Sequence, residues 1–281
     1  HVADGKTVTL STTYGGTDLN NYSITDQATT LANITPKSLT VSGITAANKV
    51  YDALTSATVS TSGVSLGGFL TGDDFTVSST GSFANKNVAN GKTVTLSNTF
   101  GGTDLNNYAI TDQTSTLANI TAKSLTISGI TAENKVYDAL TSATVSTSGV
   151  NLDGLVFGDS FTVSSSGTFA NKNVADGKTV TLSNTFGGAD LNNYSITNQT
   201  TTLANITPKS VTISGITAAN KIYDRNTSAT LITSGIVFGG IVNGDSLTGS
   251  ATGTFNNKHV ADGKTVTLST TYGGTDLNNY S

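Results

Sequence analysis

A repeat of 86 residues runs through the whole chain of 281 residues. Residues 1–23, HVADGKTVTLSTTYGGTDLNNYS, return without a difference as residues 259–281. Between these two copies, Tyr-Asp pairs begin at Tyr51, Tyr137 and Tyr223, in steps of 86 residues. A repeat of this length exceeds the roughly 20–50 residues of most solenoid units and has the size of a small domain. The sequence therefore predicts tandem domains.

The boundary between repeats is predicted where the last strand of one copy runs into the first strand of the next, near Pro36 and Pro208. Proline fixes φ and holds the preceding residue in an extended conformation, so we expect short, stiff joints and an extended rod. The last repeat stops before the segment that corresponds to residues 110–120. The predicted parts are residues 1–34 as the C-terminal part of a preceding repeat, followed by domains at 35–120, 121–206 and 207–281.

Within one period, apolar residues alternate with hydroxyl-bearing residues. Leu39 and Val41 alternate with Thr40 and Ser42, and several later runs follow the same pattern. These runs alternate apolar and hydroxyl-bearing residues with a period of two, and turns rich in Gly, Asn and Asp separate them. This pattern predicts antiparallel sheets with one buried and one hydrated face. With this strand spacing in 86 residues, the expected fold is all-β, built from tandem immunoglobulin-like β-sandwich domains.

Composition narrows the classes of function. Charged residues make up 11% of the chain, against about 25% in ordinary soluble proteins, and the net charge is −4 without a basic stripe. Nucleic acid is therefore not an expected partner. The absence of cysteine excludes disulfides and thiol chemistry and suits a chain that crosses an oxidising compartment. No apolar stretch has the length that spans a bilayer.

The three copies allow candidate catalytic and metal sites to be compared within one chain. The only histidines, His1 and His259, stand where the other copies carry asparagine, which leaves no basis for a histidine triad or cluster. We expect no enzymatic activity, no catalytic residues and no organic cofactor. An alternative is calcium bound at the joints by Asp52, Asp73 and Asp104, since hard cations prefer carboxylate oxygens.

A charged and aromatic signature recurs in every copy. On a surface with few charges, such residues are expected to hold turns and strand ends through hydrogen bonds and ion pairs. The signature residues are Lys49, Tyr51, Asp52, Lys135, Tyr137, Asp138, Lys221, Tyr223 and Asp224.

The order of these motifs resembles that of the YDG domain. The resemblance rests on ITPKSLTVSGITAANKVYDALTSATV at residues 34–59, GSFANKNVANGKTVTLS at 81–97 and LNNYAITDQTSTLANITAKSL at 105–125. The glycine that usually follows Tyr-Asp in the family is replaced here by Ala53, Ala139 and Arg225, so the turn after this pair departs from the family pattern. The YDG domain occurs in tandem in large bacterial surface proteins, notably filamentous haemagglutinin-like adhesins. The resemblance implies a secreted or cell-surface adhesin without catalytic residues.

Three functions are compatible with this sequence. The first is a passive stalk that holds a distal binding head away from the cell. The second is an extracellular filament or biofilm matrix in which copies of the chain join head to tail. In that case residues 24–34, with Ile24, Leu31 and Ile34 as apolar anchors, complete the last domain of a neighbouring chain by strand donation. The third is a glycan-binding module.

Overall fold

The computed structural model describes all 281 residues, and it shows an all-β chain with tandem repeats. Its helical content is four single turns of 3-10 helix, each formed by a Leu-Asn-Asn sequence. The turns are η1 (Leu19–Asn21), η2 (Leu105–Asn107), η3 (Leu191–Asn193) and η4 (Leu277–Asn279). No helix is both long and apolar enough to cross a membrane.

The chain divides into two compact units whose boundary does not follow the sequence repeat. The first unit contains His1–Ser124 together with two short segments of the second repeat, Val156–Asp159 and Ala189–Ser195. The second unit contains Leu125–Leu155, Ser160–Gly188 and Ile196–Ser281. These two segments of the second repeat contain Asp159, Asp190 and Tyr194.

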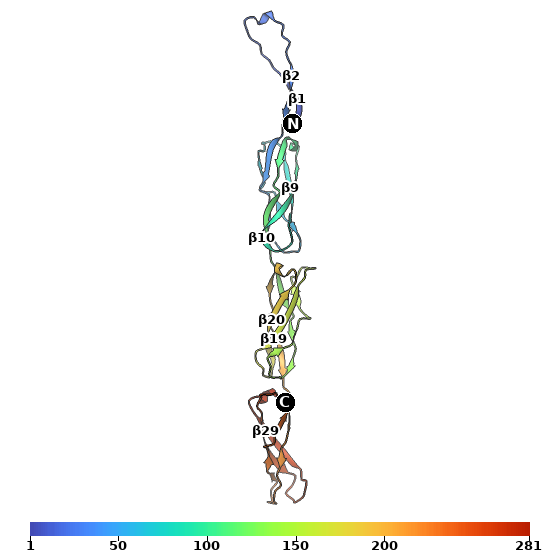
Figure 1. Cartoon of the computed structure of the whole chain (residues 1–281), viewed down its shortest axis with the longest axis vertical. Helices are drawn as coiled ribbons and strands as arrows, with labels where there is room; N and C mark the ends of the chain where they lie inside the picture. The colour runs from blue at the N-terminus through green and yellow to red at the C-terminus, as the bar shows by residue number, and fades with distance from the viewer. The chain divides into compact units, whose positions relative to one another are not determined.

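Twelve strands lie in the first unit. They are β1 (Ala3–Thr9), β2 (Thr29–Ile34), β3 (Lys37–Ser42), β4 (Thr45–Ala46), β5 (Lys49–Val50), β6 (Ser56–Ala57), β7 (Val59–Ser60), β8 (Ser65–Gly67), β9 (Thr76–Phe83), β10 (Ala89–Gly101), β11 (Tyr108–Thr111) and β12 (Ser115–Thr121). The long strands β9 and β10 lie side by side (Figure 1) at the centre of a sheet with the order β5-β12-β10-β9-β6. A second sheet has the order β11-β3-β8, and β4 pairs with β7.

The second unit repeats this arrangement. Strands β13 (Lys123–Ser128) and β21 (Tyr194–Thr197) begin in the first unit and continue into the second. The others are β14 (Thr131–Ala132), β15 (Lys135–Val136), β16 (Ser142–Ala143), β17 (Val145–Ser146), β18 (Asn151–Asp153), β19 (Thr162–Phe169), β20 (Ala175–Gly187), β22 (Thr201–Thr207), β23 (Thr212–Ser214), β24 (Thr217–Ala218), β25 (Ser228–Ala229), β26 (Leu231–Ile232), β27 (Val237–Gly239), β28 (Thr248–Phe255) and β29 (Val266–Gly273). The order β15-β22-β20-β19-β16 matches that of the first five-stranded sheet.

The expectation of antiparallel sheets holds for most strand pairs, but several pairs are parallel. In the first unit β11 runs parallel to β3 and β12 runs parallel to β5, and in the second unit β15 runs parallel to β22. Alternation of apolar and hydroxyl residues reports which face of a strand is buried, but it carries no information about strand direction. The sheets are therefore mixed.

The core follows the alternation that the sequence shows. In β3, Leu39 and Val41 are buried while Thr40 and Ser42 are exposed, and β13 repeats the pattern with Leu125 and Ile127. Glycine is required at one position of the long strand β9. A Cβ at Gly81 would come within 2.5 Å of Val59 Cγ2 and 2.8 Å of Val94 Cγ1, so the strands close on the core only with glycine there.

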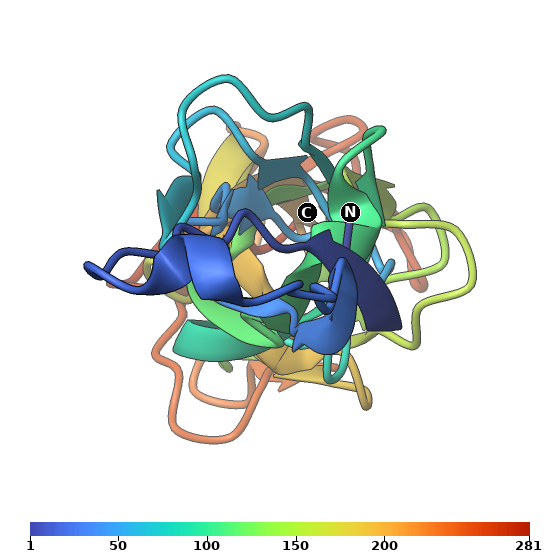
Figure 2. The same ribbon diagram turned by 90° about the horizontal axis from the view of Figure 1, so that it is seen from above.

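The two ends of the chain show incomplete versions of the same sheet. Strands β1 and β2 pair only with each other, and η1 in the loop between them is drawn in blue in the foreground of Figure 2. At the other end β29 pairs with β28 alone, whereas its counterpart β20 also pairs with β22. The exposed fractions of Leu31 and Ile34 on β2 are 68% and 49%, although Ile120 and Ile206, the counterparts of Ile34, are fully buried.

Candidate functional site

The Tyr-Asp motif begins as a local turn that lysine and aspartate hold in place. Lys49 Nζ lies 2.7 Å from Asp52 Oδ1 and donates to the backbone oxygens of Leu54 and Ser56 at 2.9 and 3.0 Å. These three acceptors match the three protons of the ammonium group. Asp52 Oδ1 also accepts a hydrogen bond from Leu54 N at 2.9 Å. The turn bends at Ala53, whose φ of 63° is left-handed, as a glycine would be.

The tyrosine of the motif points away from this turn and contacts the next repeat. Tyr51 Oη donates to Asp159 Oδ2 at 2.8 Å, and Tyr194 Oη donates to the same oxygen at 2.6 Å. The two rings meet edge to face, with centroids 5.6 Å apart and an interplanar angle of 76°. Tyr51 is 1% exposed and Tyr194 is 7% exposed. Two phenols from neighbouring repeats thus share one carboxylate oxygen in a buried position.

A lysine binds the other oxygen of the same carboxylate and a second aspartate. Lys86 Nζ lies 2.9 Å from Asp159 Oδ1 and 2.8 Å from Asp190 Oδ1, and 5.8 Å from the centroid of the Tyr51 ring. Hydrogen bonds between charged groups are stronger than neutral ones, and an ammonium over an aromatic face adds a favourable contact. We call these five residues, Tyr51, Lys86, Asp159, Asp190 and Tyr194, the first clasp.

Backbone contacts fix the clasp in register. Val88 N donates to Asn193 Oδ1 at 2.9 Å, and Asn193 Nδ2 lies 3.4 Å from Asn87 Oδ1. Asn193 belongs to the 3-10 turn η3 and is one of two buried polar residues of the chain. Val156 N donates to Tyr194 Oη at 2.9 Å, so this phenol both accepts and donates. Buried polar groups with complete hydrogen bonding specify one geometry.

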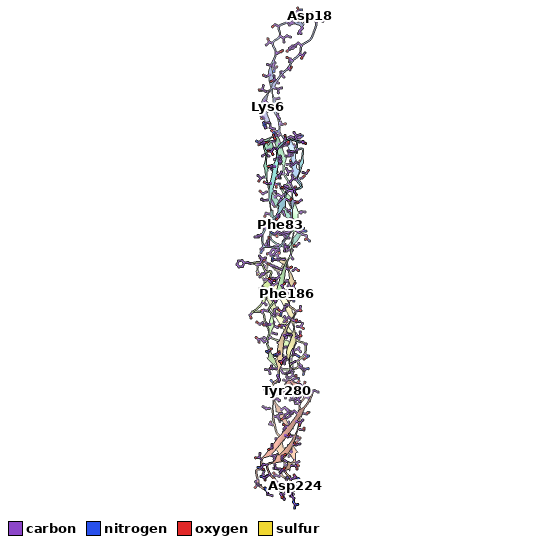
Figure 3. All side chains as sticks on the ribbon, turned by 180° about the vertical axis from the view of Figure 1, so that it is seen from behind. Lys6, Asp18, Phe83, Phe186, Asp224 and Tyr280 are labelled. Atoms are coloured by element: carbon purple, nitrogen blue, oxygen red, sulfur yellow. The ribbon has the colours of Figure 1, made fainter.

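The second unit contains the same cluster one repeat later. Tyr137 Oη and Tyr280 Oη donate to Asp245 Oδ2 at 2.8 and 2.6 Å, and the two rings are again 5.6 Å apart at 76°. Lys172 Nζ lies 3.2 Å from Asp245 Oδ1 and 3.6 Å from Asp276 Oδ1. These five residues are the second clasp. Figure 3 labels Tyr280, a residue of this clasp, and Asp224, a turn residue, which lie at opposite ends of residues 207–281.

The clasp favours the ionised carboxylate and the neutral phenols. Burial works to raise the pKa of Asp159, but hydrogen bonds from Tyr194, Lys86 and Tyr51 outweigh it and hold the pKa below its ordinary value. Asp245 behaves in the same way. Burial and the hydrogen bond to Asp159 raise the pKa of Tyr194 to about 12. Hydrogen bonds to Asp190 and Asp159 raise the pKa of Lys86 far above its ordinary value.

Some of the signature residues hold a turn within their own repeat, and others belong to a clasp between repeats. The three lysine–aspartate pairs all hold their own turns, with Lys135–Asp138 at 2.7 Å and Lys221–Asp224 at 2.8 Å. Tyr51 and Tyr137 belong to the clasps, while Tyr223 is 51% exposed. The strand-donor candidates Ile24, Leu31 and Ile34 are exposed to 44%, 68% and 49%.

The suggested calcium site is not formed by its three aspartates. Asp52 is paired with Lys49, and no three acidic or histidine side chains gather anywhere in the chain into a group that could hold a metal. Asp73 and Asp104 are the counterparts of Asp159 and Asp190 in the first clasp. In that clasp the ammonium of Lys86 lies 2.9 and 2.8 Å from the two carboxylates.

Sequence reasoning missed the clasp although its residues were visible. Tyrosine, lysine and aspartate recur at the same place in every copy, but the contact joins Tyr51 to Asp159, 108 residues further on. The interpretation of the aspartates as turn residues treated each repeat as a closed domain. The available signal was that these charges recur in all copies even though the chain has few charges.

The fold and the clasp define a class: an all-β tandem-repeat protein whose copies are linked through specific polar contacts. The YDG domain family matches residues 35–116, 121–202 and 207–281, and the chain belongs to this family. No curated protein sequence and no solved structure matches the chain.

Proposed function

We propose that the chain is a non-enzymatic structural stalk of a secreted or cell-surface bacterial adhesin. The observation that carries the proposal is the recurrence of the clasp, with the same residue types and nearly the same distances, at two successive joints. The proposal includes an immunoglobulin-like sandwich for each repeat and an extended rod for the array. A stalk needs joints that resist bending, and it needs no catalytic residue.

The residues of each joint favour a stiff connection between neighbouring repeats rather than one that rotates freely. Each clasp combines a carboxylate 2% exposed at its side chain, two phenols on one oxygen and a lysine shared by two aspartates. A flexible linker would leave these polar groups to water, whereas a buried network holds one arrangement. Stability in such arrays is a sum of repeat and neighbour terms, so each joint contributes its own share.

Small-angle X-ray scattering of residues 1–281 tests the stalk. We expect a scattering profile of one stiff, elongated particle. The variant with Asp159→Asn and Asp245→Asn removes the charge of both clasps while keeping the side-chain size. It should show a broader distribution of conformations and a smaller average dimension, because the joints then bend more freely.

Asp176→Asn is the matched control, because Asp176 is exposed and its counterpart in the preceding repeat is already Asn90. It should leave the scattering unchanged. A wild-type profile typical of flexibly linked beads, or a double variant as stiff as the wild type, would speak against the stalk.

A second candidate function is a self-assembling filament, favoured by the unpaired edge of β29. In β20 the corresponding edge is covered by β22, and residues 201–206 of that strand read TTLANI, the same as β2. Ile34 of β2 is 49% exposed, whereas its counterparts Ile120 and Ile206 in the complete repeats are buried. An edge strand with free backbone groups pairs with any strand that fits its register.

Size-exclusion chromatography with light scattering tests this filament on residues 1–281. Strand donation predicts a mass that increases with concentration through head-to-tail oligomers. Ile34→Asp should abolish the oligomers, because its counterparts Ile120 and Ile206 are fully buried. Asp4→Asn, an exposed change on β1, is the control. A strictly monomeric wild type at all concentrations removes this candidate and leaves the stalk untouched.

A further inference from the structure

The two tyrosines of each clasp form an isolated pair. In the first clasp both phenols donate to Asp159 Oδ2, at 2.8 and 2.6 Å, and the edge of one ring meets the face of the other. The second clasp repeats this arrangement around Asp245 with the same two distances and the same ring angle. The chain contains no cysteine, so it has no disulfide with which to fasten one repeat to the next.

We propose that each clasp is a site of oxidative tyrosine cross-linking, in which a dityrosine bond joins neighbouring repeats covalently. The predicted bonds are Tyr51–Tyr194 in the first unit and Tyr137–Tyr280 in the second. The modification requires a one-electron oxidant, such as hydrogen peroxide acting through a haem peroxidase. It does not depend on the stalk function, since it follows from the contact of two phenols.

Each tyrosine loses one electron to the oxidant and its phenolic proton, which leaves two neutral phenoxyl radicals. The radicals combine through a carbon–carbon bond between ring carbons ortho to the oxygens, and the two ring hydrogens at that bond then move to the oxygens. One dityrosine replaces two tyrosines with the loss of two hydrogen atoms, while one hydrogen peroxide is reduced to two water molecules.

The surroundings favour both the oxidation and the coupling. A phenol that has lost an electron is a strong acid, and Asp159 already accepts the hydrogen bonds of both phenols. The carboxylate is therefore placed to receive each phenolic proton in turn. Lys86 acts against this by pairing with the other oxygen of Asp159, at 2.9 Å, but it leaves Oδ2 to the phenols.

Burial makes the coupling selective. Tyr51 and Tyr194 are 1% and 7% exposed, so a radical formed on either ring has the other ring as its neighbour and is shielded from other chains. Tyr22 and Tyr14 are 73% and 45% exposed and can react between chains. Intramolecular bonds at the clasps and intermolecular bonds at exposed tyrosines are thus distinguishable products.

The experiment exposes residues 1–281 to tris(bipyridine)ruthenium(II) and persulfate under visible light, an oxidising system that acts by single-electron transfer. Peptide mapping by tandem mass spectrometry then identifies the linked tyrosines. We expect Tyr51–Tyr194 and Tyr137–Tyr280 peptides, each lighter by two hydrogens than the sum of its parts, in the monomeric fraction. The same treatment in concentrated urea should abolish both bonds, because unfolding separates the rings.

Single variants use one clasp as the internal reference for the other. Tyr51→Phe should abolish the first bond and leave Tyr137–Tyr280 intact, while Tyr22→Phe, at an exposed position, should change neither. Asp159→Asn removes the proton acceptor and weakens the contact that holds the two phenols together, so the yield of the first bond should fall relative to the second. Cross-links confined to exposed tyrosines, or clasp bonds formed equally well in urea, would overturn the proposal.

Discussion

At the scale of single residues, the Tyr-Asp motif performs two separate tasks. Asp52 holds its own turn through Lys49 and the Leu54 amide, whereas Tyr51 reaches into the next repeat and binds Asp159. The aspartate is partly exposed and its contacts are local. The tyrosine is buried, and its partner lies 108 residues away. A substitution in this motif therefore affects either the repeat or the joint, depending on which residue changes.

Ala53→Gly should stabilise the chain. Ala53 has a φ of 63°, and left-handed backbone costs a non-glycine residue about 1–2 kcal/mol, which exceeds the roughly 0.5–1 kcal/mol that glycine adds through unfolded-state entropy. The expected gain is up to about 1 kcal/mol, measured by urea unfolding. Ala47→Gly, at an exposed residue outside the left-handed region, is the control and should be destabilising. A lower stability of Ala53→Gly would show that the left-handed backbone at Ala53 is not strained.

Acid should weaken the clasps. The pKa values of Asp159 and Asp245 are lowered on folding, so the folded state favours the ionised carboxylates. Their contribution to stability is complete above the ordinary aspartate pKa of 3.8 and is lost as the pH falls through the lower folded values. The melting temperature of the wild type should exceed that of the Asp159→Asn, Asp245→Asn variant at neutral pH. The gap should narrow below pH 3.8, and a gap independent of pH would show that these carboxylates do not stabilise the joint.

At the scale of the strands, each repeat depends on glycine where two strands meet the core. Gly81 on β9, Gly167 on β19 and Gly253 on β28 hold equivalent positions, and a Cβ at any of them would come within 3 Å of a side chain from a neighbouring strand. In the first two repeats these side chains are valines, and in the third the closest one is Leu231. The long central strands therefore pack closely because one residue in each lacks a side chain.

Gly81→Ala should destabilise the first repeat by about 1–3 kcal/mol, the usual effect of overpacking a core. The added methyl group would meet Val59 Cγ2 at 2.5 Å. Val59→Ala removes that atom, so Gly81→Ala should cost less in the Val59→Ala background than in the wild type. Denaturant unfolding of the four proteins provides the comparison. Equal costs in both backgrounds would mean that the Val59 side chain is not the obstacle.

The sequence predicts which face of a strand is buried, but it does not predict the direction in which the strand pairs. Alternation identified the buried face of β3, where Leu39 and Val41 are 0% and 2% exposed. It did not identify the parallel pairing of β11 with β3, because strand direction depends on the path of the chain. The turn after Tyr-Asp was in question for lack of glycine, and the structure keeps the left-handed turn with alanine and arginine.

At the scale of the whole molecule, residues of one repeat complete a polar cluster with residues of the next repeat. The first compact unit includes two segments of the second repeat, and those segments carry Asp159, Asp190 and Tyr194. Sequence analysis could find the repeat because identical residues recur at a fixed spacing of 86 positions. It could not find the clasp, since contacts between copies depend on which face each side chain takes. Contacts between copies account for Tyr51, Lys86 and Asp159 and for their counterparts in the second clasp, whereas Lys49 and Asp52 hold their own turn.

The most direct test of this coupling is a double-mutant cycle between Tyr51 and Asp159, which lie in different repeats. Tyr51→Phe removes one hydroxyl, Asp159→Asn removes one charge, and urea unfolding of the full chain, fitted with nearest-neighbour terms, gives the free energies. The clasp predicts non-additive effects, with a coupling of about 0.5–3 kcal/mol. Effects that add to within about 0.3–0.5 kcal/mol would contradict it, because independent repeats behave in that way.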